Sequence, residues 1–274
     1  MDKNKKGHFI TEQEKSLAKI HELYDRVQGL DKSLEKLYPV TIADEDTFYV
    51  FDLDASNTYK FVMEHPTPMP VPKGVMAAFP LDFYEMNPSA VVSKEVFNSV
   101  EGYVFIFHEF VHCYQWDNGE SELKETLEIA QKAKKENDFM WEINYPFPYD
   151  DKKFMSETTQ LNNHFKTRDY EQVLKYHRTM AKELSPMDYE YLIWQQWKEG
   201  FARYIENLIR AKLDLKLNSA PLESPFSRVS FYELGSKHIE LLFATNSRLK
   251  GNIKDLFWEM LARQTRKSIP EKTV

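Results

Sequence analysis

The chain has 274 residues, 42% of them hydrophobic and 14% aromatic, which is enough for a sizeable core in one large domain or two closely packed lobes. A formal net charge of -7 argues against a general nucleic-acid-binding protein, because phosphate recognition needs a basic face. A single cysteine, Cys113, excludes an intramolecular disulfide and fits a reducing cytoplasm.

Residues 1–8 are basic but lead into a polar helical pattern, not into the apolar core of a signal peptide. No apolar run is long enough to span a membrane. We therefore expect a cytoplasmic protein with neither nucleic-acid nor membrane partners. The sequence gives no indication of the oligomeric state.

Residues 1–37 are predicted to form one or two amphipathic helices, since apolar side chains recur at helical intervals and Gly29 is a plausible break. The pattern then changes to short, β-branched or aromatic segments, which predict a small sheet over residues 38–82. Its expected strands are Val40–Ala43, Thr47–Leu53, Thr58–Met63 and Val75–Phe79. The segment Pro66–Gly74 cannot be a central strand, because its prolines lack the N–H donor of a β-ladder.

Residues 83–274 are predicted to be a helical lobe, which makes the fold α+β and mostly helical with a small N-terminal mixed sheet. Ser93 is the expected N-cap of its first long helix, which ends near Gly119, and residues 120–186 are expected to form an inserted helical subdomain. Further helices are predicted over residues 122–135, 151–165, 170–184, 186–217 and 229–249, followed by one from Asn252 to about Arg266.

The first long helix contains the sequence His108-Glu109-Phe110-Val111-His112 within an otherwise apolar stretch. Two histidines four residues apart lie on one helix face, where both imidazoles can bind one zinc ion. Glu109 then points beside the metal and can take a proton from the attacking water. Buried ionisable groups need a partner, and a metal is one.

Two histidines leave a tetrahedral zinc one protein ligand short of a catalytic site, and the strongest candidate for that ligand is Glu199. It belongs to a small or polar stripe on an otherwise apolar helix, together with Arg203 and Glu206, which are candidates for supporting a metal ligand or binding the substrate. The alternative is a surface stripe with an Arg203–Glu206 ion pair. Rival donors, for which a surface position is the favoured interpretation, are His164, His177, Glu142 and Glu157.

These segments resemble the gluzincin zinc metallopeptidases, and especially their aminopeptidase N-like and thermolysin-like branches. In the aminopeptidase N-like branch, the third ligand lies in a Glu-Gly-Phe-Ala motif preceded by a tryptophan, and residues 199–202 follow Trp197 here. A catalytic tyrosine lies further on in a Tyr-Glu-Lys-Gly type motif, which Tyr232-Glu233-Leu234-Gly235 resembles. The resemblance implies a zincin-like lobe and an oxyanion-stabilising role for Tyr232. His238 is a second candidate donor.

The chain also departs from that branch. Residues 74–78, Gly-Val-Met-Ala-Ala, stand where the branch has a Gly-x-Met-Glu-Asn element, and they lack the glutamate that binds a substrate amine. The gap from His112 to Glu199 is 199 - 112 - 1 = 86 residues, which is far longer than in that branch. The sequence thus predicts a zinc metallopeptidase acting on a peptide or protein substrate. The alternatives are a non-catalytic peptide-binding protein and a structural-metal protein on the same frame.

Overall fold

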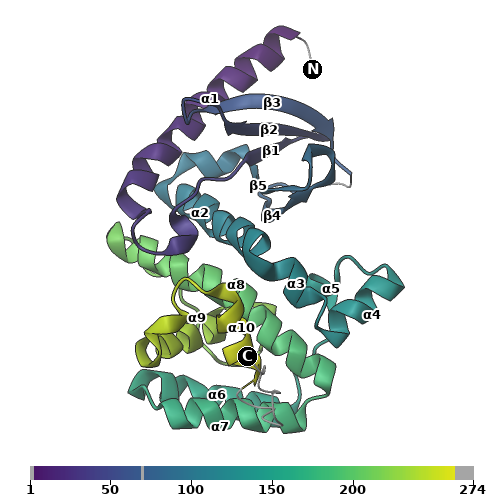
Figure 1. Cartoon of the computed structure of the whole chain (residues 1–274), viewed down its shortest axis with the longest axis vertical. Coiled ribbons are helices and arrows are strands. Elements are labelled where there is room, and N and C mark those ends of the chain that lie inside the picture. The colour runs from purple at the N-terminus through teal and green to yellow at the C-terminus, as the bar shows by residue number, and fades with distance from the viewer. Residues whose placement is uncertain (1–2, 69–70, 263–274) are drawn as a thin grey trace, which may run out of the picture. The chain divides into compact units, whose positions relative to one another are not determined.

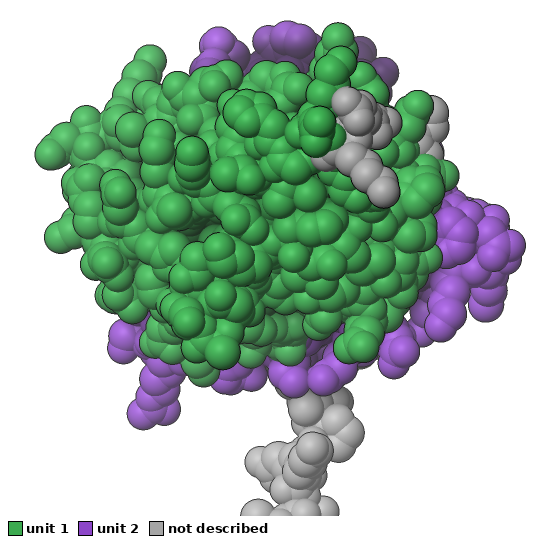
Figure 2. Space-filling view, turned by 90° about the horizontal axis from the view of Figure 1, so that it is seen from above, with its two compact units in different colours: residues 1–118, 205–218 green, residues 119–204, 219–274 purple. Residues whose placement is uncertain are grey.

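The computed structural model describes residues 3–68 and 71–262 and confirms an α+β, mostly helical fold with a mixed sheet (Figure 1). The chain divides into two compact units, unit 1 with residues 1–118 and 205–218 and unit 2 with residues 119–204 and 219–274 (Figure 2). Each unit consists of two chain segments, because helix α8 (Pro186–Lys212) begins in unit 2 and ends in unit 1. Among the described residues, no helix has both the length and the apolar character needed to cross a bilayer.

The sheet belongs to unit 1, and its strand order is β3-β2-β1-β5-β4. Within it the β1–β5 pair is parallel and the other three pairs are antiparallel. Pro66 in β3 and Pro80 in β4 lie in edge strands, where the missing proline N–H is tolerated, and Pro88 is the second residue of the interior strand β5. The strands are β1 (Val40–Asp44), β2 (Thr47–Leu53), β3 (Tyr59–Pro66), β4 (Met76–Leu81) and β5 (Asn87–Ser93).

The predicted end of the sheet at residue 82 is wrong, because β5 lies between β1 and β4. Its segment begins with Asn, Pro and Ser, a composition typical of turns. The structure accommodates this polarity by hydrogen bonding. The Ser89 hydroxyl lies 2.8 Å from the Thr41 hydroxyl and donates to the Pro39 carbonyl at 3.0 Å. These bonds satisfy polar groups that the sheet buries.

Helices α1 (Lys3–Val27) and α2 (Val100–Gln115) complete most of unit 1, with α1 packed against β3 and α2 against β4 and β5 (Figure 1). The predicted capping role of Ser93 is wrong. Ser99 caps α2, accepting a hydrogen bond from the Gly102 N–H at 3.1 Å, whereas the Ser93 hydroxyl accepts bonds from the N–H groups of residues 74–75. A Cβ at Gly102 would lie 1.8 Å from the Val96 carbonyl oxygen, so this position needs glycine.

The helices expected after Gly119 are present in unit 2 with shifted ends. The single helix predicted over residues 122–135 is wrong, since this stretch forms two separate helices, α3 (Ser121–Lys124) and α4 (Glu128–Glu136). Helix α8 starts at Pro186 as expected, with the Ser185 hydroxyl accepting from the Asp188 N–H, but ends before residue 217. The predicted end near Arg266 lies outside the described residues. The unit 2 helices besides α8 are α3 (Ser121–Lys124), α4 (Glu128–Glu136), α5 (Trp141–Asn144), α6 (Lys152–Thr167), α7 (Tyr170–Glu183), α9 (Arg228–Thr245) and α10 (Ile253–Ala262). Short turns are η1 (Lys32–Leu34), η2 (Asp82–Tyr84), η3 (Lys94–Asn98), the π-helical η4 (Trp116–Glu120) and η5 (Ser247–Leu249).

Candidate metal centre

The histidine motif lies within helix α2, as predicted. His108 and His112 are one turn apart on the same face, and their ring centroids are 5.0 Å apart. Both histidines and Glu109 are buried, at 6 to 7% exposure. Burial of three ionisable side chains on an otherwise apolar helix is unfavourable unless each has a partner, so these residues need a specific reason to be there.

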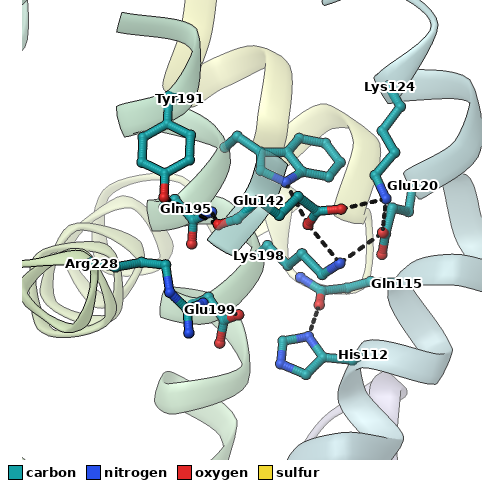
Figure 3. A network of polar contacts seen from close by, with 11 residues as sticks. His112, Gln115, Glu120, Lys124, Glu142, Tyr191, Gln195, Lys198, Glu199 and Arg228 are labelled. Atoms are coloured by element: carbon teal, nitrogen blue, oxygen red, sulfur yellow. Dashed lines mark hydrogen bonds and ion pairs between the residues drawn. The ribbon is translucent and has the colours of Figure 1, made fainter. Parts of the chain in front are cut away.

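Hydrogen bonds orient both imidazole rings. His108 Nδ1 donates to Glu206 Oε2 at 3.0 Å, and His112 Nδ1 donates to Gln115 Oε1 at 2.8 Å (Figure 3 shows the second pair). Because a carboxylate or amide oxygen can only accept, Nδ1 carries the proton in each ring. Nε2 is therefore the atom through which each histidine would bind a metal.

Glu206 is fully buried and supports His108 from helix α8. Its other oxygen, Oε1, accepts from Arg210 Nε at 2.7 Å and from Asn218 Nδ2 at 2.9 Å. Burial alone would raise the pKa of this carboxyl group. The hydrogen bond and charge of His108, with the bonds from Asn218 and Arg210, outweigh burial and lower the pKa to about 2. Glu206 is thus an ionised support for an imidazole.

Glu199 joins the two histidines in a group that could hold a metal ion, since one ligand atom from each lies within 4.8 Å of the others. Glu199 and Glu206 are seven residues apart on α8, which is two helical turns, so both project from the same helix face. The group offers two imidazoles and one carboxylate, which are donor types that zinc accepts in proteins.

The Glu199 carboxylate also lies beside Arg228 of α9 (Figure 3). Arg228 Nη1 donates to Glu199 Oε1 at 3.3 Å. The guanidinium carbons of Arg228 and Arg203 lie 5.3 and 5.7 Å from the centroid of the Tyr232 ring, which is within cation–π range. Tyr232, the predicted oxyanion donor, therefore lies beside the residue that holds Glu199.

Two glycines explain why α8 and α9 approach so closely in unit 2. A Cβ built on Gly200 would lie 2.5 Å from Gly235 Cα, and a Cβ on Gly235 would lie 2.1 Å from the Gln196 carbonyl oxygen. The two helices therefore cross with backbone against backbone, which a side chain at either position would prevent. The glycine that follows Glu199 and the glycine three residues after Tyr232 have the same structural purpose.

Lys198, the residue before Glu199, is the centre of a partly buried ion-pair network within unit 2 (Figure 3). Lys198 Nζ lies 2.8 Å from Glu120 and 2.9 Å from Glu142, and Lys124 contacts the same two carboxylates at 2.7 and 2.6 Å. Trp194 Nε1 also donates to Glu142. Burial opposes the charge on Lys198, but both carboxylates outweigh it and raise its pKa. This network fixes the part of α8 that carries Glu199.

The rival donors are not part of the metal-binding group found among the described residues. The surface position expected for two of them is wrong, because Glu142 is partly buried in the ion-pair network and His177 is 1% exposed. His164 and Glu157 are partly exposed. His238 is buried and stacks on His177 with ring centroids 4.3 Å apart, so its surroundings are those of a core side chain and we assign it no role at the site.

Three residues at the site were not singled out from the sequence, although helix spacing could have found each of them. Gln115 lies three residues after the second histidine, Arg210 four after Glu206, and Arg228 four before Tyr232. Residues three or four apart on a helix are neighbours, so each contact is local in sequence.

Searches against family models, curated proteins and solved structures found no match to this chain.

Proposed function

We propose that the protein is a zinc-dependent metallopeptidase of the gluzincin type. In this proposal His108, His112 and Glu199 bind zinc, Glu109 is the general base, and Tyr232 stabilises the oxyanion. The observation that carries the proposal is a two-imidazole, one-carboxylate group in which Nδ1 of both histidines already has an acceptor. Such acceptors orient zinc-bound histidines in metalloenzymes.

When bound, zinc would polarise a substrate carbonyl and make water acidic enough to act as a nucleophile near neutral pH. The protein residues supply the remaining steps. Glu109, one residue along α2 from His108, takes a proton from the attacking water and delivers it to the departing amine. Tyr232 donates a hydrogen bond to the oxygen that becomes negative, while the cations on its ring hold the phenol in place.

The position of the edge strand β4 favours a peptide as the proposed substrate. It lies at one end of the sheet order and packs against α2, the helix that carries the histidines. An extended peptide can add to such an edge through main-chain hydrogen bonds. Residues 74–78 at its start contain no carboxylate that would require a free substrate amine, so we do not propose an aminopeptidase. The single, buried Cys113 supports a cytoplasmic setting.

Two other functions use the same residues differently. A structural metal site would need a fourth protein ligand to close the coordination sphere, and the group among the described residues offers three. A peptide-binding protein without activity would have no chemical use for Glu109. Both alternatives are therefore less well supported than hydrolysis.

The decisive variant is Glu109→Gln, which removes the base but keeps the size of the side chain. It should retain zinc and the fold while peptide hydrolysis falls by about 10²- to 10⁴-fold. Zinc content, thermal unfolding and hydrolysis of a peptide library should be measured for both proteins. Cleavage by the variant at the parent rate would contradict the role of Glu109.

A further inference from the structure

Two arginine side chains gather around one tyrosine ring beside Glu199 in unit 2. Around the Tyr232 ring lie the guanidinium groups of Arg203 and Arg228, and Arg228 also forms an ion pair with the carboxylate of Glu199. All four side chains project from α8 or α9. Arg203 is 7% exposed, whereas the Arg228 side chain is 29% exposed, so Arg228 is the cation that a ligand can reach.

The hydroxyl groups near Arg228 are fixed by a chain of hydrogen bonds. Tyr149 donates to the Tyr191 hydroxyl, which in turn donates to the Glu142 carbonyl at 3.1 Å. Burial raises the pKa of both tyrosines, and the charge of Arg228 partly offsets this effect. These phenols remain neutral at physiological pH, so they add polarity to the surroundings of Arg228 without adding negative charge.

Arg228 has the capacity to bind a second carboxylate. Its bond to Glu199 uses Nη1, and a guanidinium group has five N–H donors. If Glu199 also binds a metal, part of its negative charge is neutralised there, and Arg228 is left beside a weaker counter-ion. A carboxylate from solution would then restore the charge balance.

We propose that Arg228 binds a carboxylate of the substrate within one or two residues of the bond that is cleaved. This inference rests on the proposed peptidase function. Arg228 contacts the Glu199 carboxylate directly, and an extended peptide advances about 3.5 Å per residue, so a group bound to Arg228 is close in sequence to one bound at Glu199. The carboxylate can be a free C-terminus or an acidic side chain.

Three peptides of one sequence separate these sources. The first has a free C-terminus, the second a C-terminal amide, and the third an amide with aspartate next to the scissile bond. Zinc-loaded wild type should cleave the first, the third or both about 10- to 100-fold more efficiently in kcat/KM than the plain amide. Arg228→Met should abolish this preference for the carboxylate peptides. Arg228→Lys should keep part of the preference, because lysine retains the positive charge but not the planar guanidinium group.

Arg178→Met is the matched control, since Arg178 is an exposed arginine on α7 and should leave the ratio unchanged. Zinc content must be measured in every variant because Arg228 also contacts Glu199. Equal loss of activity on all three peptides in Arg228→Met would overturn the inference, as would a wild type that cleaves the three equally.

A binding experiment separates this inference from the proposed function. Titration calorimetry of zinc-loaded Glu109→Gln with the same peptides should give tighter binding of the carboxylate peptides by a similar ratio. If wild type cleaves no peptide but this preference is present and is lost when Arg228→Met is added, the anion site stands and the peptidase function fails. Equal affinities for all three peptides would reject the anion site.

Discussion

Two pairs of histidines in this protein are buried and in ring contact, yet their surroundings differ. His108 and His112 in unit 1 each donate from Nδ1 to an oxygen acceptor. His177 and His238 in unit 2 stack at 4.3 Å, and three of their ring nitrogens have no hydrogen-bond partner among the described residues. An acceptor on Nδ1, more than burial or proximity, distinguishes a prospective metal ligand from a core histidine.

The second pair is therefore expected to be uncharged. Burial lowers the pKa of His238 to about 3, and burial together with the neighbouring His238 lowers the pKa of His177. Neutral imidazoles can stack in a core, but neither ring nitrogen of His177 has a hydrogen-bond partner among the described residues, so this ring leaves a buried donor unsatisfied, which is destabilising by about 1–3 kcal/mol. The comparison predicts that the first pair governs metal binding and the second pair governs stability in acid.

The largest effect should come from removing a ligand of the first pair. His112→Ala should weaken zinc binding by more than the roughly 10- to 100-fold that follows loss of a residue hydrogen-bonded to a metal ligand. His177→Phe is the matched control and should retain zinc. Competition with a chromogenic chelator measures both affinities, and equal affinities in the two variants would remove the distinction between the pairs.

A smaller loss is expected from Glu206→Gln, which keeps the shape of the side chain but removes the charge beside His108. Zinc affinity should fall about 10- to 100-fold. Chelator competition again gives the affinity, and denaturant unfolding shows whether the variant remains folded after Arg210 loses its counter-ion. Unchanged affinity in a folded variant would mean that Glu206 stabilises the fold and does not tune the metal.

Each part of this site could be predicted from the sequence only if the interacting residues lie close together in the chain. The α2 motif and the spacing along α8 are local, so helix periodicity was enough to predict the positions of His108, Glu109 and Glu199. Close contact between α8 and α9 depends on Gly200 and Gly235, which are 35 residues apart, and composition alone does not indicate that they meet. β5 was missed for a similar reason, since its polar residues are satisfied by groups far away in the chain.

The buried pair His177 and His238 should make the protein less stable in acid. Each histidine is neutral when folded, with a folded pKa below the unfolded value of about 6.5, so the unfolded state binds more protons as the pH falls below that value. Stability is therefore lost as the pH falls from about 6.5 towards 3. One such histidine contributes about 2 kcal/mol of loss between pH 7 and pH 5. His238→Phe should reduce the loss by that amount in urea unfolding at the two pH values, and an unchanged loss would contradict the assignment.

The smallest effect is expected at Gln115, whose neutral amide accepts the bond from His112. Neutral hydrogen bonds are weaker than charge-assisted ones, so Gln115→Ala should reduce zinc affinity by about tenfold or less, below the loss in Glu206→Gln. The same chelator competition ranks the two variants. A larger loss in Gln115→Ala would reverse the order of importance that we assign to the two acceptors.

Elemental analysis of the purified wild-type protein beside Glu199→Ala tests the central claim most directly. After dialysis against the same trace-metal buffer, wild type should retain about one zinc per chain, and Glu199→Ala should retain a small fraction of that amount, because the metal loses its single carboxylate ligand. Equal zinc in the two proteins, or none in wild type after zinc loading, would contradict the account.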